Sequence, residues 1–147
     1  MDVYVLPPKA ATELIDAREK AFWVAKANNA NEIIDVVVPR SAMPEFMNRV
    51  SSELAAETAS WIAGCGHAGD GNVHMSVFQG DPDVLADVMK RLYAIGMDLG
   101  GAISGEHGLG TAKRGYFEPE DPAKIELMRR IKVAFDPNGI LNPGKVL

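Results

Sequence analysis

The feature that most constrains the fold is a pair of strand-like runs that only a short turn separates. Residues 61–67 and 73–78 combine aromatic, β-branched and small apolar residues, as strands do. The residues between them include four turn formers, Gly69, Asp70, Gly71 and Asn72. The segment therefore predicts a β-hairpin, and with it an antiparallel sheet.

Helical and strand-like stretches alternate along the rest of the chain. We predict helices over residues 9–27, 41–54, 84–99 and 121–135, and strands over residues 1–6, 32–39 and 102–104. Ser41 is expected to cap the second helix, and the last helix to turn Ile125, Met128 and Ile131 inward. This order predicts one domain, residues 1–147, of the α+β class, with an antiparallel sheet and helices packed on one face.

The composition is that of an ordinary globular domain, with 47% hydrophobic and 24% charged residues. A net charge of −5 argues against nucleic-acid binding through a basic face. The single cysteine, Cys65, allows no intrachain disulfide, and we expect it to be a small buried side chain. Residues 1–20 lack a signal-peptide pattern, and no apolar run is as long as a membrane span. We therefore expect a cytoplasmic protein without a transmembrane segment.

The residues that carry chemistry gather in one part of the chain. Twelve of the 14 glycines and all three histidines lie within residues 64–115. If His67 and His74 flank the hairpin loop as a directly opposed pair, their β-carbons are about 5 Å apart, close enough to share a divalent metal. Glu106 is the preferred third ligand. Asp70 is a second candidate, although an aspartate between two glycines often stabilises its own turn.

A simpler interpretation treats Gly-Asp-Gly-Asn as a turn only, with hydrogen-bonded histidines at the surface. The placement of His67 and His74 about the turn, together with a Glu-His pair in a second glycine-rich loop, favours a site. His107 is either a general base or a residue that hydrogen-bonds the following loop. The glycines of that loop match neither the dinucleotide nor the Walker pattern, which argues against nucleotide binding there. Lys113 and Arg114 either attract an anion or form a solvated helix face.

Three strings, in this order and spacing, make the sequence recognisable: HAGDGNVH (67–74), GGAISGEHGLG (100–110) and FDPNGILNPGK (135–145). They resemble the C-terminal domain of FAD-linked oxidases, in the vanillyl-alcohol oxidase superfamily. That family includes D-lactate dehydrogenases, the flavin subunit of glycolate oxidase and D-2-hydroxyglutarate dehydrogenase. The string DVVVPRS (35–41) is also similar, and the resemblance covers residues 18–147.

The resemblance implies a role for each of seven residues. His67, His74 and Glu106 match metal ligands, the metal being Zn or Mn, and His107 matches the base that takes the substrate's hydroxyl proton. Arg18 and Asn72 match residues that bind the substrate, a small 2-hydroxy carboxylate, and Asn142 matches a segment near the flavin. FAD would be held mostly by a separate FAD-binding domain that these residues do not include. The chain alone is then expected to be inactive, and homo-oligomer formation is left open.

The chain departs from the 2-hydroxyglutarate enzymes of this family at two positions. Phe22 and Ile33 stand where those enzymes are expected to carry polar residues for a second carboxylate. Apolar residues there favour a monocarboxylate such as lactate or glycolate. Two other functions remain as alternatives: a stand-alone metallohydrolase using two histidines and a glutamate, and a non-catalytic binding or assembly domain.

Overall fold

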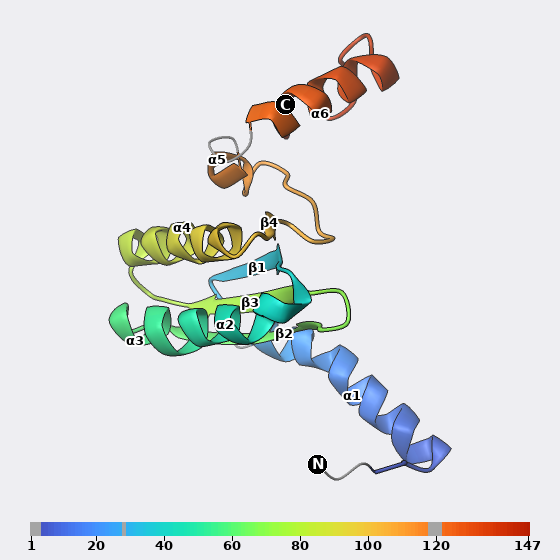
Figure 1. Ribbon diagram of the computed structural model, residues 1–147, viewed down its shortest axis with the longest axis vertical. Helices are drawn as coiled ribbons and strands as arrows, with labels where there is room; N and C mark the ends of the chain where they lie inside the picture. Colours follow the sequence, from blue (N-terminus) through green and yellow to red (C-terminus); the bar gives the residue numbers. More distant parts are fainter. Residues whose placement is uncertain (1–3, 28, 118–121) are drawn as a thin grey trace.

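The computed structural model describes residues 4–27, 29–117 and 122–147. The elements follow in this order (Figure 1): α1 (Pro8–Ala27), β1 (Glu32–Val37), the 3-10 turn η1 (Arg40–Ala42), α2 (Met43–Asn48), the π-helical segment η2 (Arg49–Leu54), α3 (Ala55–Glu57), β2 (Trp61–His67), β3 (Asn72–Phe78), α4 (Pro82–Asp98), β4 (Ala102–Ile103), α5 (Arg114–Phe117) and α6 (Pro122–Phe135). The predicted helices and strands recur, except for the strand at the start of the chain. The short helix α5 was not predicted.

The four strands form one antiparallel sheet in the order β2-β3-β1-β4. The β2–β3 hairpin is confirmed. The succession β1-α2-β2-β3-α4-β4 is a split βαβ arrangement, in which each helix crosses the sheet between strands that are not neighbours. This topology places β1 and β3 at the centre of the sheet, where most of their residues are at least partly buried.

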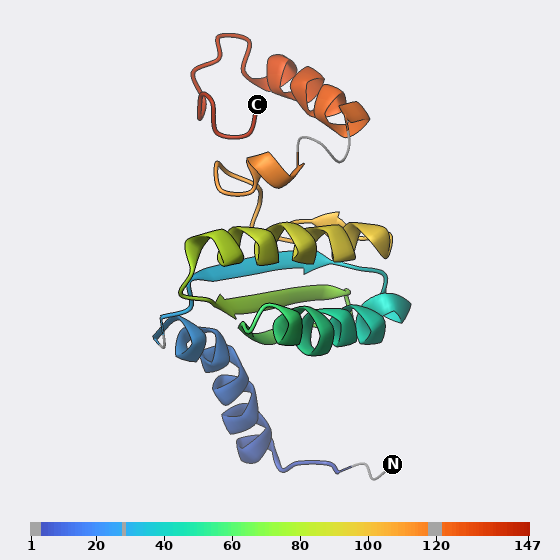
Figure 2. The same cartoon turned by 90° about the vertical axis from the view of Figure 1, so that its left-hand side faces the viewer.

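One face of the sheet carries the hydrophobic core. Side chains alternate between the faces of a strand, and those of Ile34, Val36, Val73, Met75 and Val77 are buried on the same side. One helical layer covers them, as Figure 2 shows with α4 and the α2–α3 segment side by side in front of β1 and β3. The helical layer contributes buried side chains of its own, among them Phe46, Val50, Leu54, Val88 and Leu92. The α+β prediction, with helices on one face, is therefore confirmed.

Helix α4 has clear start and stop signals in its sequence. The carboxylate of Asp81 accepts hydrogen bonds from the backbone N–H groups of Asp83 and Val84, and Pro82 occupies the first turn. Gly100 follows the helix at a φ of 77°, a left-handed conformation that glycine adopts without strain. These local signals fix where the chain turns back into β4.

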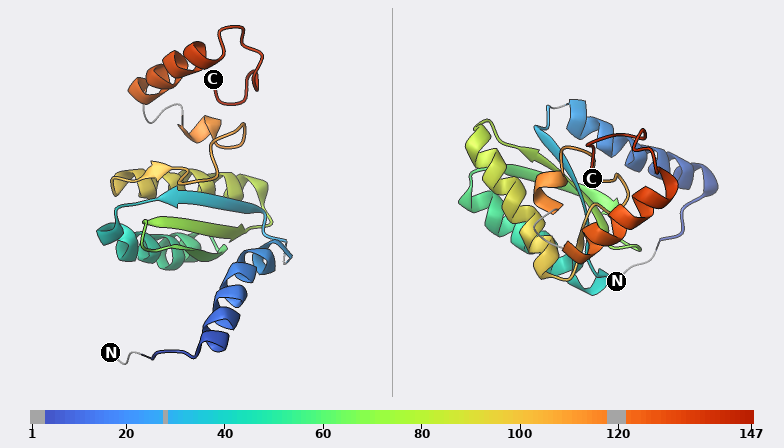
Figure 3. Two further views of the ribbon diagram at one scale, coloured as in Figure 1. Left: turned by 90° about the vertical axis from the view of Figure 1, so that its right-hand side faces the viewer. Right: turned by 90° about the horizontal axis from the view of Figure 1, so that it is seen from above.

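The opposite face of the sheet is polar. Asp35 of β1 pairs with His74 of β3, and His74 pairs with Cys65 of β2, so all three side chains lie on this face. Asn72 and Ser76 share it, because they are two residues from His74 along β3. Figure 3 shows this face uncovered by α2–α4, with α1 and the loop after β4 at its borders.

Two predictions for the first half of the chain are wrong, the strand at its start and the helix cap at Ser41. Residues 1–3 lie outside the described residues, and Tyr4, Val5 and Leu6 form no strand and are exposed. Ser41 does not cap a helix: no side-chain cap bond is found at the start of η1 or α2 within the described chain. Because the chain enters α2 through a 3-10 turn, Ser41 is already helical, whereas a capping residue needs a non-helical backbone.

The last helix is less buried than predicted. In α6 Ile125 is buried and Met128 partly so, but Ile131 is 50% exposed. Figure 1 shows the reason, since α6 lies beyond α5 and away from the helical layer that covers the sheet. Asp121, the predicted start of this helix, lies outside the described residues. Among the described helices, none has both the length and the apolar character needed to cross a membrane.

Candidate metal and substrate site

The hairpin brings two histidines together on the polar face, in a register that differs from the predicted one. His67 pairs with Asn72, and His74 pairs with Cys65, so the two histidines are diagonal neighbours rather than directly opposed. The reason is the length of the turn, because β3 begins at Asn72 and not after it. The rings are still close, with centroids 5.6 Å apart and edge to face.

Glu106 reaches the same place from the loop that follows β4. Its Oε1 lies 2.9 Å from Nε2 of His74 and 3.4 Å from Nε2 of His67. Ligand atoms of the three residues all lie within 4.8 Å of one another. His74 is 9% exposed, whereas Glu106 is 49% exposed, so the cluster is anchored in the sheet and open toward solvent. Two imidazole nitrogens and one carboxylate oxygen are a donor set that suits a divalent metal and leaves room for a further ligand.

His107 faces this cluster as well. Its ring stacks on that of His74, with centroids 4.7 Å apart and an angle of 21° between the planes. Its Nε2 is 3.8 Å from Oε1 of Glu106. An extended backbone would have turned His107 away from Glu106, but residues 105–107 form a bend. Both side chains therefore point to the same region.

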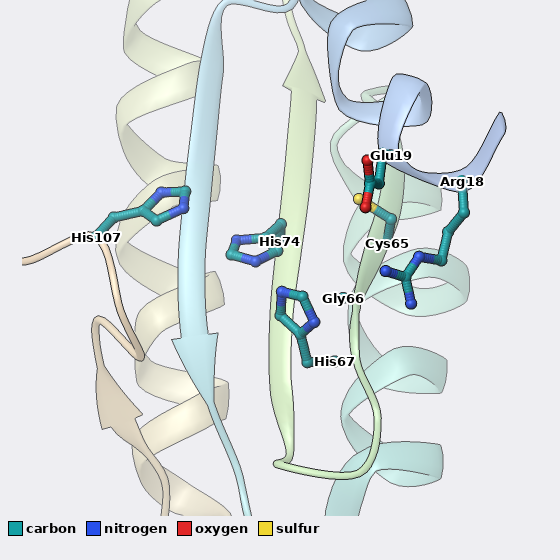
Figure 4. Close-up of a pocket in the computed structure, with 7 residues that line it drawn as sticks. All are labelled: Arg18, Glu19, Cys65, Gly66, His67, His74 and His107. Atoms are coloured by element: carbon teal, nitrogen blue, oxygen red, sulfur yellow. The ribbon is translucent and has the colours of Figure 1, made fainter. Parts of the chain in front are cut away.

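A pocket joins the histidines to helix α1. Arg18 and Glu19 line it from α1, Cys65 and Gly66 from β2, and the three histidines complete it (Figure 4). Cys65 was expected to be buried but is exposed. It sits on the polar face, where it pairs with His74.

Asp35 is a residue of this region that the sequence reasoning missed. Its side chain is fully buried and accepts hydrogen bonds from Oγ of Ser104 at 2.9 Å and from three consecutive backbone N–H groups, those of Gly105 (3.0 Å), Glu106 (3.0 Å) and His107 (2.7 Å). Burial raises the pKa of its carboxyl, but these hydrogen bonds outweigh burial and lower the pKa to about 2. The signal was present in the sequence, as one charged residue inside an apolar β-branched run.

Lys113 belongs to the same cluster. Its Nζ lies 3.6 Å from Oδ2 of Asp35, and its side chain is mostly buried. Of the two alternatives for Lys113, the solvated helix face is therefore wrong, and the anion that its ammonium group faces is a carboxylate of its own chain.

Comparison with known protein families places these residues in context. The model of the family "FAD linked oxidases, C-terminal domain" matches residues 3–146. This chain belongs to that family. It is similar to an uncharacterized FAD-linked oxidoreductase of Mycobacterium tuberculosis, with 58% identity over 99% of the chain and 32% of the relative. It is also similar to a D-lactate dehydrogenase of Archaeoglobus fulgidus (38% identity, 100% of the chain, 33% of the relative) and to glycolate oxidase subunit GlcD of Bacillus subtilis (33% identity, 92% and 30%).

The chain thus spans about a third of the length of these curated FAD-linked relatives. Of the residues that the FAD-linked oxidase motifs single out, His67, His74, Glu106 and His107 lie together in the structure. Arg18 lines the pocket beside three of them, the histidines.

Asn72 is next to the cluster rather than in it. It is buried, and its Oδ1 has no hydrogen-bond partner among the described residues. A β-carbon added at Gly105 would lie 2.6 Å from that oxygen. Glycine at this position therefore allows the loop after β4 to pass close to Asn72. Asn72, His67, Asp70 and Glu106 line a second pocket. Asp70 is not one of the three residues whose ligand atoms converge.

Asn142 lies elsewhere. It is exposed in the tail after α6, at a φ of 47°, and does not line either pocket. Asp136 holds this tail by accepting hydrogen bonds from the backbone N–H groups of Ile140 and Leu141 and from Lys132. Two positions, Phe22 and Ile33, were expected to distinguish a monocarboxylate from a dicarboxylate substrate. Ile33 is half-buried on the polar face, and the side chain of Phe22 is not among those that the structure describes.

Proposed function

We infer that this chain is the substrate-side domain of an FAD-dependent dehydrogenase that oxidises a small 2-hydroxy acid. In this proposal FAD is held mostly by an FAD-binding domain outside residues 1–147. Membership of the FAD-linked oxidase family and relatives named D-lactate dehydrogenase and glycolate oxidase subunit support it. A cytoplasmic location stays a prediction, and homo-oligomer formation stays open.

The observation that carries the proposal is the convergence of His67, His74 and Glu106 within 4.8 Å, with His107 stacked on His74. These residues come from a hairpin and from a separate loop. Oε1 of Glu106 lies 2.9, 3.4 and 3.8 Å from Nε2 of His74, His67 and His107, respectively. Histidines that served only as polar surface groups would not need to surround one carboxylate oxygen in this way. Metal-ligand clusters of this composition commonly leave one position open.

In the proposed site His67, His74 and Glu106 hold a divalent metal, Zn or Mn. His107 accepts the proton of the substrate hydroxyl at its Nε2, a task for which a neutral imidazole is suited near neutral pH. Its stacking on His74 keeps the ring beside the cluster. When bound, the metal would lower the pKa of the substrate hydroxyl and FAD would accept the hydride.

Arg18 is proposed to bind the substrate carboxylate, because it reaches the pocket from α1 opposite the histidines. Arginine suits that role, since its guanidinium can donate two parallel hydrogen bonds to one carboxylate. Asn72 would line the same site, and Asn142 would lie near the flavin in the assembled enzyme. The apolar Ile33 on this face favours a monocarboxylate over a dicarboxylate substrate.

Elemental analysis and an absorbance spectrum of the purified chain test this proposal first. We expect one divalent metal per chain and no tightly bound flavin. Supplying the FAD-binding domain in trans should then produce dye-linked oxidation of D-lactate or glycolate, and little of D-2-hydroxyglutarate.

Two outcomes would favour the alternatives. Ester or amide hydrolysis by the chain without flavin would support a metallohydrolase of two histidines and a glutamate. Absence of metal, with unchanged partner binding in a His67→Ala, His74→Ala variant, would support a non-catalytic assembly domain.

A further inference from the structure

The loop that carries Glu106 and His107 is attached to the sheet through one residue. Asp35 accepts hydrogen bonds through its carboxylate from Ser104 Oγ and from the backbone N–H groups of residues 105, 106 and 107. Its own backbone carbonyl accepts a further bond from the N–H of Ser104 at 2.9 Å. Four consecutive residues are thus bound to a single aspartate.

This loop would not hold its shape from its own residues. Glycines at positions 105, 108 and 110 give its backbone wide conformational freedom. Ser104 adopts a φ of 71°, a left-handed conformation that costs energy for a residue with a side chain. The hydrogen bonds that offset this cost are those to Asp35, and bonds to a carboxylate are about twice as strong as neutral ones.

Asp35 is itself held rigidly. It lies in β1, which has β3 on one side and β4 on the other, and it pairs directly with His74. Its carboxylate is fully buried, with Nζ of Lys113 3.6 Å away. The sheet therefore fixes one histidine of the cluster through the backbone of β3, and fixes the loop residues Glu106 and His107 through Asp35.

We propose that Asp35 is a positioning residue that sets the side chains of Glu106 and His107 against His74 by holding their backbone N–H groups. Asp35 is not one of the three residues whose ligand atoms converge, and it does not line the pocket that the histidines share with α1. This proposal rests on the proposed function only in taking a metal as the ligand of the cluster. The ordering of the loop is argued from the hydrogen bonds to Asp35 alone.

A purely structural role for Asp35 makes a different prediction. If the carboxylate only stabilised the fold, its loss and the loss of Glu106 would weaken metal binding independently, and the two effects would add. If Asp35 acts through Glu106, its replacement costs little once the Glu106 carboxylate is gone. A double-variant cycle separates the two roles.

The test uses the full 147-residue chain, with Co²⁺ alone as the probe, titrated by its visible absorption. Asp35→Asn should lower Co²⁺ affinity by on the order of 10–100-fold, the range for residues that orient ligands. The double variant Asp35→Asn, Glu106→Gln should bind no more weakly, within about threefold, than Glu106→Gln alone. Asp87→Asn, the same change at an exposed aspartate of α4, should leave the affinity unchanged. Additive losses, or an unaltered affinity in Asp35→Asn, would overturn the proposal.

Amide hydrogen exchange is the second measurement, and it does not depend on metal. In Asp35→Asn the amides of residues 105–107 should lose protection while those of β3 keep theirs. If the unaltered chain takes up no Co²⁺, the proposed function fails, and exchange decides the role of Asp35 by itself. Equal loss of protection in the loop and in β3 would refute positioning. Should Asp35→Asn not fold, Ser104→Ala removes one of the bonds without changing charge, and must show the same selective loss.

Discussion

Nε2 of His74 lies 2.9 Å from Oε1 of Glu106, so a strand of the hairpin and a loop beyond β4 meet over the polar face of the sheet. The two residues approach each other because Asp35 is next to both: it pairs with His74 across the strands and binds the backbone N–H of Glu106. The cluster thus depends on one central strand, and its properties can be tested residue by residue.

Replacing either hairpin histidine should abolish tight metal binding. His67→Ala and His74→Ala each remove one donor nitrogen, and the loss should exceed the roughly 10–100-fold that the loss of an orienting residue costs. Calorimetric titration with Zn²⁺ measures it. The third ligand is tested by Glu106→Gln, which should also weaken binding, and its control is Glu126→Gln, the same change at an exposed glutamate of α6, which should bind like the unaltered chain. Retention of full affinity in both histidine variants would show that they are not ligands.

His107 should matter for turnover but not for metal affinity. In the enzyme assembled with its FAD-binding domain, His107→Gln removes the proposed proton acceptor and should lower kcat by roughly 10²–10⁴-fold. Zn²⁺ affinity should change less than threefold, because His107 is not one of the three residues whose ligand atoms converge. Steady-state kinetics with D-lactate gives the first value. An unchanged kcat would remove His107 from the mechanism.

The unfolding free energy should fall in acid because of Asp35. Its pKa of about 2 in the folded chain lies below its ordinary value of 3.8, so the unfolded chain binds the proton more readily. The stability that this carboxylate contributes is present in full above pH 4 and is lost as the pH falls through 2. The loss should be about 2 kcal/mol and absent in Asp35→Asn, as urea unfolding of the metal-free chain at a series of pH values would reveal. Parallel curves for the two proteins would contradict it.

Two leucines offer a matched test of the core. Leu92 of α4 is fully buried against the sheet, whereas Leu127 of α6 is 54% exposed. Leu92→Ala should reduce the unfolding free energy by about 2–5 kcal/mol, since it leaves a cavity. Leu127→Ala should change it by no more than about 0.5 kcal/mol. Similar values for both in denaturant titration would mean that α4 does not pack as described.

Of two glycines in the hairpin, only one should be sensitive to the addition of a methyl group. A β-carbon at Gly66 would meet the backbone carbonyl oxygen of Asn72 at 2.3 Å and Cα of Val73 at 2.9 Å. Apart from its neighbours in the chain, a β-carbon at Gly69 would meet no atom of the described residues within 4 Å. Gly66→Ala should therefore push β2 from β3 and cost about 1–3 kcal/mol. Gly69→Ala should be nearly neutral. Thermal unfolding distinguishes them, and equal melting temperatures would be inconsistent with this strand pairing.

Much of the fold could be read from local sequence. The turn formers at 69–72 between two strand-like runs predicted the hairpin, and Asp81-Pro82 before an apolar helical pattern marks the start of α4. The α+β class and the helices on one face followed from the order of these elements. The motifs around His67, His74 and Glu106 also indicated the family. These features depend on residues close together along the chain, where spacing and residue type decide the outcome.

Only the tertiary structure decided how the elements meet. The diagonal register of His67 and His74, the exposure of Cys65 and the half-exposed Ile131 each depend on which strand or helix covers which face. Asp35 is the clearest case, since the local sequence shows only a charged residue in an apolar strand, where an unpaired carboxylate would destabilise the fold. It becomes a buried anchor because β4 and the loop after it return to β1 and bring their N–H groups to its carboxylate. Hydrogen bonds between distant segments leave no periodic pattern in the sequence, so the fold alone determined which donors this carboxylate binds.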